Sequence, residues 1–192
     1  PMMPAPMITT FSPGAGIIGL GIIQCLRAMG ADLKKIIVVD TAVNRLEVAR
    51  KLGATDTVNI IDLEAEGSSC YRKAMELAGA VPLSFFPGIP VPAVDLVYDA
   101  VGYIRNNPAP PAIEQALKMV REWGRIVVVG AYEEPVTVDL TSLYAKHLNV
   151  QGSYAYTLPE DMREAIELVR SGKVDRNCLL YTSDAADEED SV

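Results

Sequence analysis

The chain contains 192 residues, of which 49% are hydrophobic and 22% are charged. This composition is typical of a folded globular domain and argues against a disordered chain, a collagen-like repeat or a small disulfide-framed fold. The formal net charge of −8 argues against nucleic acid as a partner, and the longest apolar runs are far shorter than the ~20 residues of a membrane helix, so no membrane partner is expected.

Strands and helices are predicted to alternate along most of the chain. The β-branched run over residues 35–40 indicates a strand buried on both faces, as in a parallel sheet. In chain order, strands are predicted over 7–12, 35–40, 57–60, 94–98, 125–129 and 148–154, and helices over 17–29, 44–52, 68–77, 112–122, 141–146 and 159–170. Such alternation with short connections predicts an α/β fold, a doubly wound six-stranded parallel sheet (Rossmann) forming a single domain over residues 1–178.

Two segments depart from this alternation. Residues 79–93 contain Pro82, Pro87, Pro90 and Pro92, so we expect a Pro-rich surface loop through which no regular element runs. Residues 179–192 form an acidic tail that resembles a translated sequencing-library adaptor, the alternative being a natural solvated tail. We assign no function to this tail.

The segment from Gly14 to Gly19 reads Gly-Ala-Gly-Ile-Ile-Gly and fits the pattern G-x-G-x-x-G. A predicted strand precedes it and a predicted helix begins within it, which is the context in which this pattern binds a dinucleotide. Gly14 would allow the tight turn, Gly16 the close approach of a pyrophosphate, and Gly19 tight packing of the helix. The alternative is a glycine turn that serves packing alone.

Asp40 ends the second predicted strand, 21 residues after Gly19. A carboxylate at this place can accept hydrogen bonds from the adenosine-ribose hydroxyls and would repel a 2′-phosphate, which predicts NAD rather than NADP as the cofactor. Arg45 follows closely, and it either packs on the adenosine or is a solvated helix charge.

Further candidate residues follow later strands, because ligands of an open α/β sheet bind beyond the carboxyl ends of its strands. Asp99 is expected to cap the turn after its strand rather than to contact a ligand. The predicted cofactor-binding residues are Gly14, Gly16, Ile17, Ile18, Gly19, Asp40, Arg45, Ala100, Val101, Gly102, Val129, Gly130, Ala131, Gly152 and Ser153.

From about residue 8 to residue 175 the chain resembles the cofactor domain of the medium-chain, zinc-type alcohol dehydrogenases, which include polyol and threonine dehydrogenases. The stretches that carry the resemblance are GAGIIGL (14–20), RLEVARKLGA (45–54), DLVYDAVG (95–102), WGRIVVVG (123–130), GSY (152–154), AIELV (165–169) and SGKV (171–174). The resemblance implies oxidation of a small-molecule alcohol to a carbonyl, with hydride passing to the nicotinamide of NAD. It also implies that the backbone of residues 129–131 and 152–153 borders the nicotinamide.

The chain lacks the catalytic domain of that family, with its Gly-His-Glu motif and upstream Cys, so we expect a fragment with no catalytic residue of its own. Zinc is expected only in the missing domain, because His147 and three widely spaced cysteines do not form a ligand set. The same cysteine pattern favours a reducing, cytoplasmic compartment. Two alternatives remain, namely a free-standing NAD-binding regulatory module and a doubly wound domain that binds S-adenosylmethionine or a flavin.

The sixth predicted strand, residues 148–154, is expected at an edge of the sheet. An apolar edge strand leaves backbone groups unpaired, and pairing with a symmetry mate would satisfy them, so we expect a homo-oligomer joined there. Val150, Tyr154 and Tyr156 would then lie in or near the interface. The alternative is an edge covered by the helix over 159–170.

Overall fold

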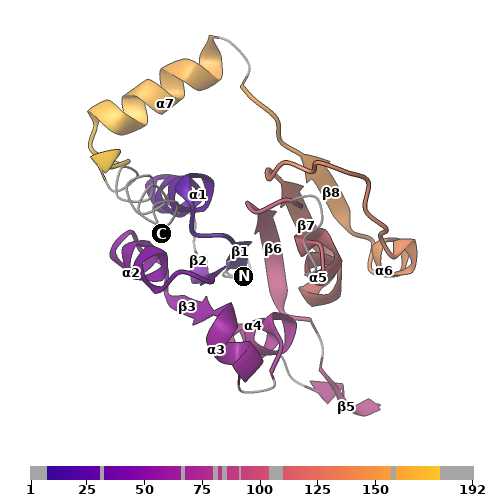
Figure 1. The fold of residues 1–192 in the computed structure, drawn as a ribbon. Helices are drawn as coiled ribbons and strands as arrows, with labels where there is room; N and C mark the ends of the chain where they lie inside the picture. Colours follow the sequence, from indigo (N-terminus) through magenta and orange to yellow (C-terminus); the bar gives the residue numbers. More distant parts are fainter. Residues whose placement is uncertain are drawn as a thin grey trace, which may run out of the picture.

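A parallel sheet of six strands in the order β3-β2-β1-β6-β7-β8 organises the computed structural model of the chain (Figure 1). The structure describes residues 8–30, 33–65, 68–79, 82–83, 86–90, 92–103, 110–156 and 159–177. The strands are β1 (Ile8–Pro13), β2 (Leu33–Asp40), β3 (Asp56–Asn59), β6 (Val94–Asp99), β7 (Val120–Val128) and β8 (Asn149–Gly152). The strand order reverses between β1 and β6, as in the doubly wound dinucleotide-binding fold, so the predicted fold class is confirmed.

Helices cover both faces of this sheet and follow the strands as predicted, with one addition. They are α1 (Ile17–Ala28), α2 (Val43–Lys51), α3 (Ile60–Ala65), α4 (Cys70–Ala78), α5 (Ala112–Met119), α6 (Leu140–Ala145) and α7 (Glu160–Arg170). The short helix α3 was not predicted, because six residues directly after a strand are too few to give a clear helical period.

The apolar residues of strand β2 pack into two hydrophobic cores, one on each face of the sheet. Successive side chains of a strand point to opposite faces. Ile36 and Val38 therefore pack with residues of α1 and α2, whereas Ile37 and Val39 pack with residues of α4 and α5. All four side chains are buried, which confirms the expectation of a strand enclosed on both faces.

The expectation that no regular element runs through residues 79–93 is wrong. Two short strands, β4 (Pro82–Leu83) and β5 (Phe86–Pro90), pair antiparallel as a separate two-stranded sheet. A two-stranded ribbon has two free edges, so a proline whose missing N–H faces outward removes no ladder hydrogen bond. The prolines are therefore incompatible with a central strand in this segment but compatible with a two-stranded ribbon.

The boundary between α5 and β7 also differs from the prediction, which extended the helix to Glu122. The helix ends at Met119 and the strand begins at Val120. The register of β7 against β6 is irregular there, and Trp123 adopts a left-handed conformation with a φ of 61°. The exposed Trp123 ring stacks on the ring of His147, with centroids 4.3 Å apart, so His147 lies at the surface as expected.

The C-terminal helix α7 lies apart from the sheet, at the upper left of Figure 1. Its residues are exposed apart from the half-buried Leu168. The segment that follows is held to α1 by Gln24, whose amide oxygen accepts a hydrogen bond from the backbone N–H of Asp175 at 2.6 Å. The predicted acidic tail at 179–192 lies outside the described residues, and none of the described helices is long and apolar enough to cross a membrane.

Candidate functional site

The glycine turn joins β1 to α1 at the point where the strand order reverses. Gly14 has a φ of 90°, a conformation that favours glycine, and its N–H donates to the carbonyl of Val39 in β2 at 2.8 Å. A Cβ on Gly19 would lie 1.8 Å from the carbonyl oxygen of Gly14, so only glycine lets α1 pack this closely on the turn. Both glycines are therefore required by the protein's own backbone.

Gly16 differs from its two neighbours because nothing lies within 4 Å of the position that its Cβ would take. It is the N-terminal cap residue of α1, and no side chain caps this helix. The first backbone hydrogen bond of the helix runs from Leu20 N–H to Gly16 C=O at 2.9 Å. The N–H groups before Leu20 in the first turn therefore have no acceptor within the helix. Open space at a glycine beside free N–H groups fits the close approach of a phosphate.

Two large aliphatic side chains, Ile17 and Ile18, stand in this first turn with exposed fractions of 57% and 46%. Val101, at the end of β6 on the other side of the reversal point, is also 49% exposed, and its Cγ2 lies 2.9 Å from where a Cβ of Gly14 would stand. The turn and the end of β6 thus adjoin, and apolar side chains border the open space.

Asp40 at the end of β2 is more engaged with the protein than the sequence indicated. Its carboxylate accepts hydrogen bonds from the N–H of Ala15 at 2.7 Å and from the N–H of Ala42 at 2.9 Å, and only 8% of the residue is exposed. Each carboxylate oxygen keeps a further lone pair, so the group can still accept from a hydroxyl. Asp40 therefore supports the glycine turn, and Arg45 lies in the next helix, α2, where it is partly exposed.

The turns after β6 and β7 approach each other closely at two glycines. A Cβ on Gly102 would lie 2.0 Å from the carbonyl oxygen of Ala131, and a Cβ on Gly130 would lie 2.1 Å from the N–H nitrogen of Gly102. The space that their side chains would fill is occupied by the protein itself, and their expected contact with a cofactor stays a prediction. On its other side the end of β6 is joined to β1, because Ala100 donates its N–H to the carbonyl of Pro13 at 3.3 Å.

Asp99 caps the turn after β6, as predicted. Its Oδ1 accepts hydrogen bonds from the N–H of Val101 at 3.2 Å and of Gly102 at 2.8 Å, and the residue is fully buried. Its other carboxylate oxygen accepts from the hydroxyl of Tyr132, a residue that sequence reasoning missed. Tyr132 follows β7 by four positions in a segment without periodicity, so no local signal marked it.

The remaining predicted positions lie at the end of β8. Gly152 is the last residue of this strand, and the N–H of Ser153 donates to the carbonyl of Val128 at 2.8 Å. Both residues are exposed. The predicted residues at the ends of β1, β2, β6, β7 and β8 therefore all lie at the carboxyl edge of one sheet, which is where this architecture binds ligands.

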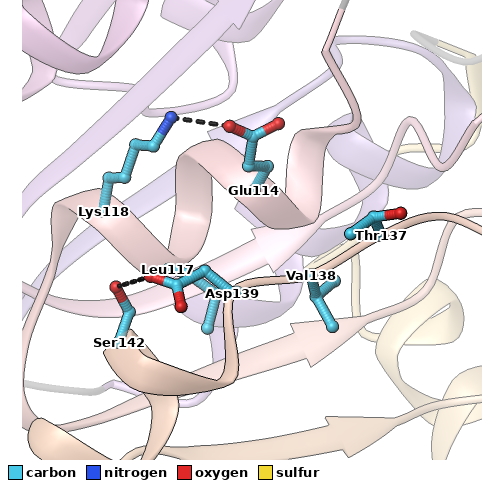
Figure 2. Close-up of a pocket in the computed structure, with 7 residues that line it drawn as sticks. All are labelled: Glu114, Leu117, Lys118, Thr137, Val138, Asp139 and Ser142. Atoms are coloured by element: carbon cyan, nitrogen blue, oxygen red, sulfur yellow. Dashed lines mark hydrogen bonds and ion pairs between the residues drawn. The ribbon is translucent and has the colours of Figure 1, made fainter.

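A separate hollow of about 300 Å³ lies between α5 and α6 (Figure 2). Its charged groups already have partners within the protein. Lys118 pairs with Glu114 at 2.7 Å, and Asp139 accepts from the N–H of Thr141 and the hydroxyl of Ser142 at the start of α6. These bonds stabilise helices and leave no group directed at a ligand, so we assign no site there.

Potential metal ligands do not gather in the part of the chain that the structure describes, where no group of three or more His, Cys, Asp or Glu residues could hold an ion. Burial raises the pKa of the Cys70 thiol to about 12, which keeps it protonated and makes it a poor ligand. The described residues therefore do not fit a catalytic zinc, which requires three protein ligands.

A doubly wound sheet with an open glycine turn at its reversal point and an acidic residue ending β2 defines a dinucleotide-binding domain. Residues 18–171 match the family model described as zinc-binding dehydrogenase. The chain belongs to this family.

Similar proteins include a putative D-xylulose reductase of Agrobacterium fabrum, 31% identical over 87% of this chain, and an L-threonine 3-dehydrogenase of Bacillus velezensis, 34% identical over 84% of it. The chain spans 40% of the length of each of these relatives. Among solved structures, an alcohol dehydrogenase of Escherichia coli CFT073 complexed with NADH superposes with a TM-score of 0.70 at 22% identity, covering 97% of this chain and 49% of that one.

Proposed function

We propose that this chain is the NAD-binding half of a zinc-type alcohol or polyol dehydrogenase. The observation that carries the proposal is Gly16, where a position at the start of α1 opens onto unfilled space beside free backbone N–H groups. The pyrophosphate of the cofactor would lie there, stabilised by the N–H groups and the dipole of α1. When bound, NAD supplies the acceptor for a hydride from the carbon that bears the alcohol.

The protein's own residues bind and orient this cofactor rather than react with it. Asp40 would accept from the adenosine-ribose hydroxyls, because it ends β2 beside the glycine turn and its oxygens have lone pairs to spare. Arg45 in the next helix would pack near the adenosine. Ile17, Ile18 and Val101 would exclude water from the pyrophosphate and the adjoining half of the cofactor.

The proposal that the cofactor is NAD rather than NADP rests on charge. A 2′-phosphate would be brought against the nearly buried carboxylate of Asp40, and such a contact costs enough to give a preference of about 100-fold or more. Calorimetric titration of the chain with NADH and with NADPH tests this directly. Equal affinities, or tighter binding of NADPH, would refute it.

The alcohol and the zinc would be bound by the part of the relatives' length that this chain does not span. Since the described residues do not provide a ligand set for zinc, we derive no step through the metal. We expect the purified chain to bind cofactor and to leave alcohols unoxidised, with or without added zinc. Zinc-dependent turnover with metal near one atom per chain would contradict this expectation.

We further propose that the enzyme assembles through β8. This strand is at the edge of the sheet, and all four of its residues are exposed. The exposed fractions of Val150, Tyr154 and Tyr156 are 40%, 100% and 57%, and the residues of α7 are themselves mostly exposed. A second copy of the chain paired along β8 would satisfy its free backbone groups and cover these side chains.

A further inference from the structure

Asp99 accepts hydrogen bonds from both of the turns that follow β6 and β7. Its carboxylate accepts from Val101 N–H, Gly102 N–H and the hydroxyl of Tyr132, while its backbone carbonyl accepts from Val129 N–H at 2.9 Å and Gly130 N–H at 2.8 Å. One fully buried residue of β6 thus holds both turns.

Backbone contacts continue this connection outward. Tyr103 N–H donates to Ala131 C=O at 2.9 Å, and Glu133 N–H donates to Tyr103 C=O at 3.1 Å. Together with the close approach of Gly102 and Gly130, these bonds join residues 99–103 and 129–133 into one unit. We call this unit the β6–β7 clasp.

Tyr132 contributes the side-chain hydrogen bond that reaches Asp99 from the β7 turn. Its neighbours Ala131 and Glu133 are exposed, whereas Tyr132 packs against the main hydrophobic core. The Tyr132 side chain is half-buried, and burial together with its bond to Asp99 raises the pKa of its hydroxyl, which keeps it a proton donor. Without that donor, one oxygen of a buried carboxylate would lose its partner.

We propose that Tyr132 is a positioning residue that fixes the β6–β7 clasp as the surface against which the nicotinamide half of the cofactor lies. This inference rests on the proposed function. In a doubly wound sheet the dinucleotide spans the reversal point, so with its adenosine at the end of β2 and its pyrophosphate at α1, its other half lies over β6 and β7. Tyr132 lies in the turn after β7, and β6 separates β7 from β1 and β2 in the sheet. A shift of that turn would misplace the nicotinamide half and leave the half bound at β2 and α1 unaffected.

The test compares two ligands on the full chain. NADH probes both halves of the site, whereas ADP probes only the adenosine and pyrophosphate half. Tyr132→Phe removes the hydroxyl and keeps the ring, and Tyr144→Phe on the exposed face of α6 is the matched control. We expect Tyr132→Phe to weaken NADH binding about tenfold, the effect of one lost interaction of ~1.4 kcal/mol, and to change the affinity for ADP less than twofold.

Amide hydrogen exchange at Gly102 and Gly130, measured without ligand, gives a second readout that we expect to accelerate in Tyr132→Phe alone. Equal weakening of NADH and ADP, or no weakening of either, would overturn the inference while leaving the proposed function intact. A wild-type chain that binds neither NADH nor ADP would overturn both.

Discussion

Replacing Asp40 by Ala removes the acceptor of two backbone hydrogen bonds at the glycine turn. Hydrogen bonds to a charged group contribute about 1.5–3 kcal/mol each. The N–H of Ala15 is buried and would be left without a partner, whereas Ala42 is half-exposed and water can replace the carboxylate there. We therefore expect Asp40→Ala to lower the free energy of unfolding by about 2–4 kcal/mol, a large part of the 5–15 kcal/mol typical of a domain.

Urea denaturation followed by circular dichroism measures this loss, with Glu47→Ala on the exposed face of α2 as the control. Asp40→Asn keeps one acceptor oxygen and is expected to fall between the wild type and Asp40→Ala. Cofactor titration adds a second expectation, namely that Asp40→Ala narrows the gap in affinity between NADH and NADPH. The variant loses both the acceptor for the ribose hydroxyls of NADH and the charge that repels the 2′-phosphate of NADPH. If Asp40→Ala and Glu47→Ala unfold at the same urea concentration, the carboxylate does not support the turn.

Three further predictions concern other parts of the chain. Val150→Lys places a charge on the edge strand β8, and light scattering should show a shift from dimer to monomer while cofactor binding is retained. A wild-type chain that is already monomeric at tens of micromolar would refute assembly through β8. The Lys146 ammonium donates to three carbonyls at the end of α5, including those of Leu117 and Val120. Lys146→Met should therefore lower the free energy of unfolding, measured in urea, by about 2–3 kcal/mol. The control is Lys173→Met at an exposed site, which should cause no measurable loss. Burial raises the pKa of Cys70 from 9.0 to about 12. At pH 8 its thiol should therefore be alkylated about three orders of magnitude more slowly in the folded than in the unfolded chain. Mass spectrometry can follow both rates, and comparable rates would contradict the burial of Cys70.

The parts of the fold that could be predicted are those with a local signal. The run from Ile36 to Val39 indicates a doubly buried strand from four neighbouring residues, and the glycine spacing from Gly14 to Gly19 marks the turn and the start of α1. Asp40 directly follows the run from Ile36 to Val39, so its place at the end of β2 could be predicted as well. Each of these inferences needs only residues close together in the chain.

The parts that were missed depend on contacts between distant residues. Asp40 bonds Ala15 across 25 positions, and Tyr132 bonds Asp99 across 33, so neither partner is visible in a sequence window. The close approach of Gly102 and Gly130 likewise joins distant residues, whereas their predicted contact with a cofactor stays a prediction. The irregular start of β7 places Trp123 in a left-handed conformation that its residue type does not favour, and tertiary pairing with β6 and His147 overrides that preference.

We propose that the opening at Gly16 receives the pyrophosphate of the cofactor. Gly16 has a φ of −72° and a ψ of −172°, which valine also adopts, and no atom lies within 4 Å of its Cβ position. Gly21, in the second turn of α1, is equally unhindered, so Gly21→Val is a matched control for Gly16→Val.

Calorimetric titration of both variants with NADH, at unfolding free energies shown to be close to that of the wild type, decides the matter. We predict that Gly16→Val loses NADH affinity by about 100-fold or more, equivalent to ~2.7 kcal/mol, while Gly21→Val binds as the wild type does. A folded Gly16→Val chain that binds NADH within threefold of Gly21→Val would contradict it.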